Sequence, residues 1–519
     1  LKVHPANDQR LGMAMASGYS MAKRSISCYL VTQGPALANV AMPLLELKSQ
    51  CLPLIIIGEG VSTEMKGSLA FQEFDSMSFM APLTKWQYRI DSVERLTWAI
   101  NYSVQMALSG KPGPVYLEIP INLLNTEFNA TQSWSQIHNA NISEPIKFMP
   151  SDSDVKNLAE LINKFEKIVV IAGSGCLMSD AKAELEKFIE LTGAVALCTA
   201  SGRGSISENN KNYLGLSGLY LSPFVKPLLE QADMFIFVGS QCEETAMMNI
   251  SEFLQGKTVS AINIAYEDIG RNLDITCGIV GDAKLTLKAL VPFITKKENE
   301  IWQSQITDIQ NKCYSDTAEQ LKRFNDYPVF HLCESLSEIS KTSKFNLIFE
   351  NGINEMWFYL YPFLISSNIK YFCPGEHTGL GIAYGNALGI TVATQNPAIV
   401  VTGDGAFYFS ISSLSIAAEL GLGFTAIVLN NKALGWPKYH QNKHGMSCGT
   451  DFKHAPDLKK LSEAYGVQYF KPMNKSELSE AIVLGLENSR NGKTSLIDLD
   501  IEFKEQYPSS VLDLYSEGA

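Results

Sequence analysis

The sequence predicts an α/β fold of three doubly wound domains with mostly parallel sheets. Three observations support this prediction. Short apolar runs of strand length alternate with longer runs of helix length along the chain. Several of these strands are apolar throughout and end in glycine or polar turns, as expected for parallel sheets that are buried on both faces. With 519 residues, 46% of them hydrophobic, the chain is long enough for several cores, and we expect three.

The stretch from 400 to 436 has the pattern strand, Gly-Asp-Gly turn, helix-like run, strand, Asn-Asn turn. Such a βαβ unit places both turns at the carboxyl ends of its strands, where open α/β sheets bind ligands. Asp404 offers a carboxylate oxygen, Asn431 an amide oxygen and Ala433 its carbonyl, and Mg²⁺ prefers oxygen ligands of these kinds.

The glycines of the same turn suit an anion. Gly403 and Gly405 let the backbone approach a ligand closely. The N–H groups of Gly405 and Ala406 are expected to open a helix toward a phosphate. Together the two turns predict a site for a hard cation that carries a phosphate.

Asp404 and Asn431 lie 27 positions apart, and this spacing resembles the motif of thiamine-diphosphate-dependent enzymes. The resemblance implies that thiamine diphosphate and Mg²⁺ bind here. The alternative is a glycine turn and an Asn-capped loop in some other α/β sheet.

Composition limits the other partners. A formal net charge of −12 and a pI near 5.2 argue against nucleic acid and anionic membranes. No apolar run approaches the length of a transmembrane helix. Ten scattered cysteines without a CxxC pair favour a cytoplasmic enzyme with reduced thiols. The first residue is Leu1, so the original N-terminus cannot be judged for targeting.

Residues 1–145 are predicted to form the first domain, with strands at 27–32, 52–57 and 114–120. The landmarks are Thr-x-Gly-Pro at 32–35, Ala-Phe-Gln-Glu at 70–73, Thr-Lys-Trp at 84–86 and Gly-Lys-Pro-Gly-Pro-Val-Tyr at 110–116. In this order they resemble the pyrimidine-binding domain of the acetolactate synthase and pyruvate oxidase branch, without its usual opening strand. The resemblance implies that Gln72 faces C2 of the cofactor and that Lys85 lies near the same cleft, unless Lys85 is a surface lysine.

Gln9 lies nine positions before Gly18, where most members of this family carry a glutamate that exchanges a proton with N1′ of the aminopyrimidine. A glutamine can hydrogen-bond N1′ but cannot relay a proton. Three interpretations follow. The enzyme works with a weaker N1′ partner, as in the glyoxylate carboligase branch; Asp8 takes the role instead; or the homologue is catalytically impaired.

Residues 150–320 are predicted to form a central Rossmann-like domain after a helix-capping linker at 151–154. Its strands are expected at 167–172, 195–199, 234–238 and 261–264, and the turn Gly173-Ser174-Gly175 leads into a helix. The resemblance implies FAD here in acetolactate synthases and ADP or CoA groups in acyl-CoA decarboxylases. The chain has Gln-Cys-Glu-Glu-Thr at 241–245 in place of the Asp-Asp-Arg run of FAD-binding synthases, so we expect no FAD.

Residues 325–519 are predicted to form the diphosphate-binding domain, beginning with a strand at 346–349. The resemblance places Gly352, Ile353 and Asn354 at the diphosphate, or else they form a plain helix cap. It places Leu380 under the bent cofactor, or else in the core. His377 is a candidate proton shuttle or a structural histidine. The basic segment 436–445 borders a substrate pocket or is a solvated loop.

The resemblance implies a thiamine diphosphate and Mg²⁺ dependent lyase or carboligase, a decarboxylase or an acetolactate-synthase-like transferase. Its substrate is a 2-oxo acid or a related ketone. One alternative is a 2-hydroxyacyl-CoA lyase or oxalyl-CoA decarboxylase, because Phe-Gln-Glu-Phe-Asp at 71–75 also resembles that branch. Another is a non-catalytic homologue that keeps the cofactor. Because the pyrimidine and diphosphate ends are held by different subunits in this family, a homodimer or homotetramer is expected.

Overall fold

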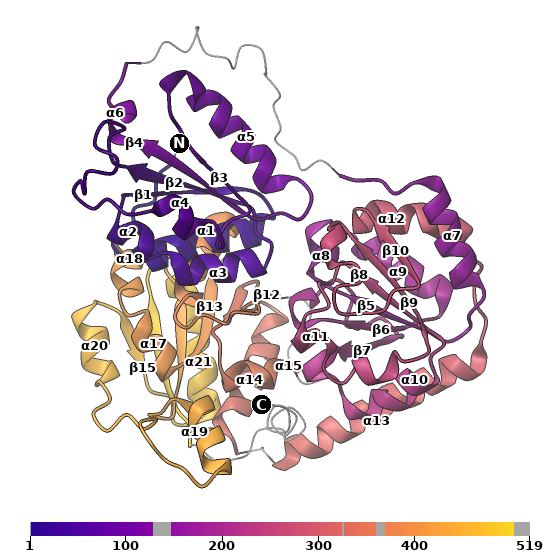
Figure 1. The fold of residues 1–519 in the computed structure, drawn as a ribbon. Helices are drawn as coiled ribbons and strands as arrows, with labels where there is room; N and C mark the ends of the chain where they lie inside the picture. Colours follow the sequence, from indigo (N-terminus) through magenta and orange to yellow (C-terminus); the bar gives the residue numbers. More distant parts are fainter. Residues whose placement is uncertain (1, 128–146, 324–325, 360–368, 503–519) are drawn as a thin grey trace.

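Three parallel sheets form the structure, one in each of three lobes (Figure 1). The computed structural model describes residues 2–127, 147–323, 326–359 and 369–502. In Figure 1 the first lobe lies above the third, and the second lobe stands beside both. The prediction of three doubly wound α/β domains is confirmed. The sheets lie within the predicted ranges 1–145, 150–320 and 325–519, whose boundaries stay predictions.

The sheet of the first lobe has four parallel strands. The elements are α1 (Gln9–Lys23), β1 (Ser27–Val31), α2 (Pro35–Ala38), α3 (Ala41–Ser49), β2 (Leu54–Gly60), α4 (Ser76–Met80), β3 (Trp86–Arg89), α5 (Leu96–Leu108), β4 (Pro114–Pro120) and α6 (Ile121–Leu124). The strand order is β1-β2-β4-β3, and all seven residues of β4 are buried. Strand β3 was not predicted from the sequence, because its residues are only half-buried and form no apolar run.

The sheet of the second lobe has six parallel strands in the order β10-β9-β8-β5-β6-β7. The elements are α7 (Asp152–Asn163), β5 (Ile168–Ala172), α8 (Ser174–Met178), α9 (Lys182–Thr192), β6 (Val195–Cys198), β7 (Tyr213–Leu216), α10 (Lys226–Gln231), β8 (Met234–Val238), α11 (Glu244–Met247), β9 (Thr258–Asn263), β10 (Cys277–Val280), α12 (Ala283–Leu290) and α13 (Glu300–Arg323). The four predicted strands correspond to β5, β6, β8 and β9. The helix-capping linker predicted at 151–154 is confirmed. Ser151 caps α7, because its hydroxyl accepts a hydrogen bond from the backbone N–H of Asp154.

The sheet of the third lobe has six parallel strands in the order β12-β11-β13-β14-β16-β15. The elements are α14 (Pro328–Ser340), β11 (Asn346–Phe349), α15 (Ile353–Tyr359), β12 (Lys370–Phe372), α16 (Ala383–Thr394), β13 (Ala398–Gly403), α17 (Asp404–Phe409), α18 (Ser413–Leu420), β14 (Thr425–Asn430), α19 (Gly435–Lys443), α20 (Leu458–Ala464), β15 (Gln468–Phe470), α21 (Lys475–Arg490) and β16 (Ser495–Asp500). The one helical run expected between the two turns is two helices, α17 and α18. Ser410 separates them, and its hydroxyl donates to the carbonyl oxygen of Gly381, 2.6 Å away.

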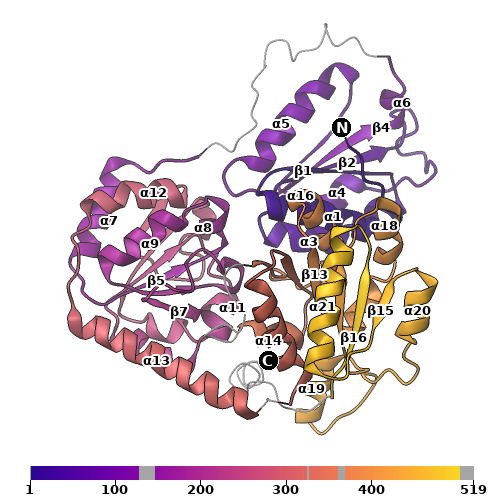
Figure 2. The ribbon, with the colours of Figure 1, turned by 180° about the vertical axis from the view of Figure 1, so that it is seen from behind.

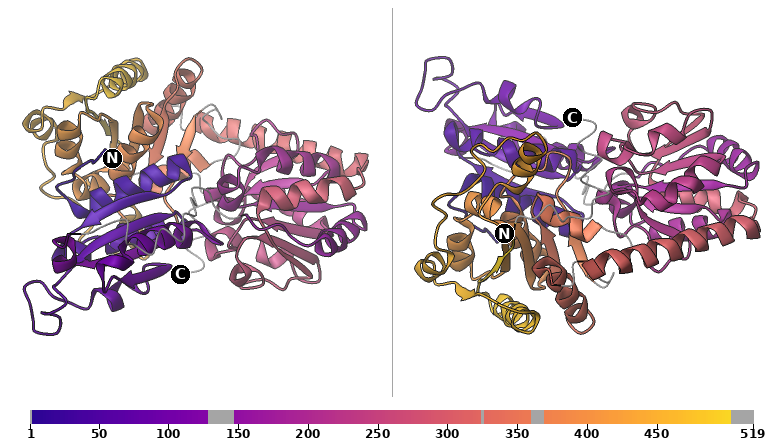
Figure 3. Two further views of the ribbon diagram at one scale, coloured as in Figure 1. Left: turned by 90° about the horizontal axis from the view of Figure 1, so that it is seen from above. Right: turned by 90° about the horizontal axis from the view of Figure 1, so that it is seen from below.

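The first and third lobes meet along α1 and α16, which lie against each other in Figure 2. Glycines allow this close approach. A Cβ on Gly18 would clash with the backbone of Asn386, and one on Gly389 would clash with the carbonyl oxygen of Met15. The second lobe lies to one side of this pair when the molecule is seen from above or below (Figure 3).

Candidate active site

The two predicted ligand turns lie side by side at one edge of the third sheet. Strand β13 pairs in parallel with β14, and Gly403 is opposite Leu429. The turn after β13 leads directly into α17, whose N-cap is Gly403. In the turn after β14, Lys432 has a φ of 54°, a left-handed conformation that is uncommon for a lysine and often marks a functional site.

Asp404 is buried beside these turns with one oxygen unused. Asp404 is 1% exposed, and its Oδ1 accepts a hydrogen bond of 2.9 Å from the N–H of Gly405. Oδ2 has no hydrogen-bond partner among the described residues. Burial raises the pKa of this carboxyl to about 6. A buried carboxylate oxygen without a donor is costly, and a bound cation would satisfy it.

The Asn431 turn faces Asp404. Asn431 Oδ1 accepts a hydrogen bond of 3.0 Å from the N–H of Ala433, and an amide oxygen keeps a second lone pair for a metal ion. The backbone N–H groups of Gly405, Lys432 and Ala433 lower the pKa of Asp404, opposing the larger effect of burial. This set of one carboxylate, one amide and one carbonyl fits Mg²⁺, which takes few protein ligands. It differs from a His/Cys/carboxylate cluster, and the described residues contain no group of three such side chains that could hold a metal.

A cavity of about 420 Å³ opens over these turns. Such a volume is in the range of sites for cofactors and small molecules. Eight of the residues predicted to bind cofactor or metal line it: Gly352, Leu380, Gly403, Asp404, Gly405, Ala406, Asn431 and Ala433. Ile353 and Asn354 are the first residues of α15, and their side chains lie outside the described part of the structure.

Comparison with known proteins agrees with this geometry. Three family models match: the "N-terminal TPP binding domain" of thiamine pyrophosphate enzymes at residues 1–79, the "central domain" at 155–290 and the "C-terminal TPP binding domain" at 350–499. The chain belongs to the thiamine pyrophosphate enzymes. It therefore depends on thiamine pyrophosphate, also called thiamine diphosphate, as a cofactor.

Relatives match along nearly the whole chain of this thiamine pyrophosphate enzyme. The "Probable acetolactate synthase large subunit" of Methanococcus aeolicus is 26% identical over 97% of this chain and 85% of its own length. The "Acetolactate synthase large subunit" of Buchnera aphidicola subsp. Schizaphis graminum is 24% identical over 96% and 87%. The "Acetolactate synthase isozyme 3 large subunit" of Escherichia coli K12 is 23% identical over 97% and 88%.

The four predicted catalytic residues of the enzyme do not line the cavity of their own chain. Gln9 begins α1, where its Oε1 accepts a hydrogen bond of 2.9 Å from Asn39 Nδ2. Gln72 is exposed on the loop after β2. His377 is exposed, and its neighbours in the chain, Glu376 and Thr378, both line the cavity. These three roles are untested predictions.

Lys85 also lies away from the cavity. Its Nζ donates to the carbonyl oxygen of Ser109, and burial lowers its pKa. Asp8, the alternative to Gln9, caps α1 by accepting from the N–H of Arg10 and forms an ion pair of 2.9 Å with the Arg10 guanidinium. Its carboxylate is therefore already engaged by α1.

Only the beginning of the basic segment borders the cavity. Trp436 and Pro437 of α19 line it, whereas Lys438 forms an ion pair of 2.6 Å with Asp451. The ring of His440 packs edge-on against Trp436, with 4.8 Å between the ring centroids. The structure therefore gives this segment an aromatic and apolar contribution to the cavity wall.

Two parts of the cavity wall were missed from the sequence. Glu355 is 6% exposed, and the Tyr359 hydroxyl donates to its Oε2 at 3.3 Å. Burial raises the pKa of Glu355 well above its usual value. The sequence offered one signal for Glu355, because it lies three residues after Gly352, which was predicted to contact the diphosphate. Tyr220 and Thr245 come from the second lobe, and only the tertiary fold brings them to this wall.

No helix of the described residues has the length and apolar character needed to cross a membrane.

Proposed function

We propose that the enzyme is a thiamine diphosphate and Mg²⁺ dependent carboligase or lyase, similar to acetolactate synthase, that acts on a 2-oxo acid or a related ketone. The observation that carries the proposal is the unpartnered Oδ2 of Asp404 in the 420 Å³ cavity. Asp404, Asn431 and the Ala433 carbonyl would hold the cation, and the cation would hold the diphosphate. The names and coverage of the relatives support the carboligase class.

The residues of this chain would orient and shield the cofactor. Gly403, Gly405 and Ala406 would let the diphosphate approach the start of α17, and Gly352 would lie beside it. Leu380 would support the bent cofactor from the cavity wall. When bound, thiamine diphosphate supplies a carbon nucleophile and an electron sink for breaking or forming a C–C bond.

We propose that two copies of the chain complete each site, so that the enzyme is a homodimer or a homotetramer. None of Gln9, Gln72 and Lys85 lines the cavity of the same chain, and no Lys, Arg or His is among the described residues that line it. The loop that carries Gln72 presents Leu69 and Phe71, which are 95% and 83% exposed. An apolar loop of this kind is expected to be covered, and a second copy would place it over the cavity.

The compartment is also a proposal. All ten cysteines are free in the structure, and several of them are buried. This supports a cytoplasmic enzyme, because disulfides are rare in reducing compartments.

Turnover by native protein and by a Gln9 variant tests the proposal. We expect native protein, supplied with thiamine diphosphate and Mg²⁺, to turn over at least one member of a 2-oxo acid panel that includes pyruvate and glyoxylate. The substitution Gln9→Glu restores a group that can exchange a proton, so it should change turnover. Gln105→Glu, at a half-buried glutamine of α5 in the same lobe, is the matched control and should change nothing.

Three results are informative. Native activity that only Gln9→Glu alters would support an active enzyme with a weak N1′ partner. Activity that appears only in Gln9→Glu would mean that the native site is silenced. Silence of both proteins on 2-oxo acids, followed by turnover of acyl-CoA or cyclic ketone substrates, would overturn the 2-oxo acid class and favour the acyl-CoA alternative.

A further inference from the structure

The second lobe has a groove at the carboxyl ends of its strands, the place where open α/β sheets bind nucleotides. Two small cavities lie along it, of about 150 and 120 Å³. Each is close in size to a cavity that holds a single benzene ring. Gln241, which follows β8, lines both cavities, together with Ser174 and Met178 of α8.

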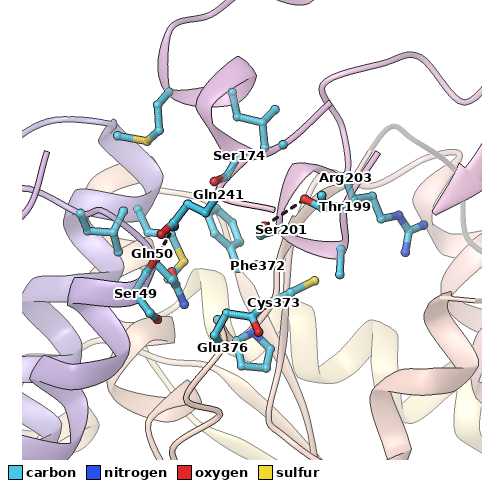
Figure 4. A pocket seen from close by; sticks show the side chains of 18 of the residues that line it. Ser49, Gln50, Ser174, Thr199, Ser201, Arg203, Gln241, Phe372, Cys373 and Glu376 are labelled. Carbon is cyan, nitrogen blue, oxygen red and sulfur yellow. Dashed lines mark hydrogen bonds between the residues drawn. The ribbon is translucent and has the colours of Figure 1, made fainter. Parts of the chain in front are cut away.

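The side chain of Gln241 extends from the second lobe to the first. Its Nε2 donates a hydrogen bond of 3.0 Å to the carbonyl oxygen of Ser49, at the end of α3 (Figure 4). Its Oε1 accepts a hydrogen bond of 2.9 Å from Lys111 Nζ, in the loop before β4. One glutamine therefore joins two separate parts of the first lobe to the carboxyl edge of the central sheet.

Lys111 makes a second contact across the same interface. Its Nζ forms an ion pair of 2.7 Å with Oδ2 of Asp268, which follows β9 and is 5% exposed. Arg271 pairs with the other oxygen of Asp268 at 3.1 Å. Buried charges of this kind are stable only when paired, so the ion pairs of Asp268 with Lys111 and Arg271 stabilise the groove at β8 and β9, although Oδ1 of Asp268 accepts no hydrogen bond among the described residues.

The glycine turn that begins α8 is also engaged. The N–H of Gly173 donates to the carbonyl oxygen of Val238 at 2.8 Å, and the N–H of Gly175 donates to that of Gly239 at 2.9 Å. A Cβ on Gly173 would lie 2.6 Å from Cα of Ser240. These glycines are thus required for two loops to pack together, and their N–H groups are not free to bind a pyrophosphate.

We infer that this groove of the second lobe, the central groove, is a closed interface between the first and second lobes and does not bind a dinucleotide such as FAD. The residues present do not fit that cofactor. Each cavity is small for a dinucleotide, and Gln241, which lines both, is hydrogen-bonded across the groove to Ser49 and Lys111. The N–H groups of Gly173 and Gly175 are also engaged by backbone carbonyl oxygens. The inference concerns the central groove and holds whichever substrate the cavity of the third lobe takes.

Flavin binding tests the inference directly. The full chain, as purified and after incubation with excess FAD, is passed through gel filtration and read at the visible flavin absorbance. A known flavoprotein carried through the same steps is the positive control. We expect no flavin to elute with the chain. One FAD per chain in the protein peak would overturn the inference.

Hydrogen exchange tests the interface. Gln241→Ala should speed backbone exchange in the segments 49–51 and 110–113 of the first lobe. The matched control is Gln303→Ala, because Gln303 donates 2.8 Å to the Gly193 carbonyl oxygen within the second lobe alone. Faster exchange in the first lobe for Gln241→Ala only is the expected result. Equal exchange in both variants and native protein would show that Gln241 does not hold the lobes together.

Discussion

Two glycine turns follow the carboxyl ends of parallel strands in this molecule, but only one of them borders a large cavity. The turn at 403–405 opens onto a cavity of about 420 Å³, and Asp404 beside it keeps an oxygen without a partner. The turn at 173–175 packs against the loop after β8, and the N–H groups of Gly173 and Gly175 donate to the carbonyl oxygens of Val238 and Gly239. Both turns satisfy the sequence pattern of a strand followed by glycines and a helix.

The difference lies in which buried carboxyl groups have a cationic partner within the protein. The buried carboxylate of the central groove, Asp268, is paired with Lys111 and Arg271. The buried carboxyl groups near the cavity, Asp404, Glu350 and Glu355, have no ion pair with a cationic side chain among the described residues. In this molecule, the glycine turn that indicates a cation site is the one whose neighbouring buried carboxyl groups have no cationic partner.

Asp404→Asn should give the largest effect of the substitutions that test this comparison. The amide removes the charge that the cation needs, so Mg²⁺ and cofactor binding should fall by more than the tenfold to hundredfold typical of outer-shell substitutions. Burial raises the pKa of Asp404 to about 6, so its ionised form is unfavourable without a cation. The thermal midpoint measured without Mg²⁺ at neutral pH should therefore hold or rise, while calorimetry shows lost binding.

The control for this pair of measurements is Asp500→Asn, at a partly exposed aspartate that ends β16, outside the cavity. It should leave Mg²⁺ binding unchanged. If Asp404→Asn bound Mg²⁺ as tightly as native protein, the cation site would lie elsewhere.

Glu350→Gln tests the unpaired carboxyl groups through pH. Glu350 is buried at the end of β11, and its oxygens accept hydrogen bonds from the N–H groups of Asn351 and Ala383. Burial raises its pKa from 4.5 to about 8. Between these values the folded state holds a proton that the unfolded state has lost, so this group makes stability fall as pH rises, by at most about 1.4 kcal/mol per pH unit.

Thermal midpoints measured across that pH range would check the slope. Glu350→Gln stays neutral at every pH, so its midpoint should decline less steeply than that of native protein. Glu298→Gln, at an exposed residue, should follow the native slope. A Glu350→Gln slope identical to the native one would mean that Glu350 is ionised in the folded protein.

The sequence predicted the fold class and the cavity floor because local patterns encode them. Apolar strands such as residues 234–238 are fully buried, and Asp404 and Asn431 come together because each follows one of two adjacent parallel strands, β13 and β14. It did not predict β3, whose residues are half-buried, nor the break at Ser410, where a side chain bonds a distant carbonyl. Contacts between lobes, such as Gln241 with Ser49, join residues far apart in the chain and leave no local pattern.

Lys111→Met should give the smallest effect and tests the paired side of the comparison. Methionine keeps most of the apolar stem but removes the charge, which leaves Asp268 with Arg271 alone. Losing one partner of a buried charged group costs about 2 kcal/mol, so the thermal midpoint should fall. The added substitution Asp268→Asn should recover part of the loss, because no buried charge then lacks its partner. Lys187→Met is the matched control: Lys187 pairs with Glu190 at 2.9 Å on the surface, where such pairs contribute little. If Lys111→Met and Lys187→Met had the same thermal midpoint, the network around Gln241 would not stabilise the interface between the first and second lobes. The difference between the two glycine turns would then rest on backbone packing alone.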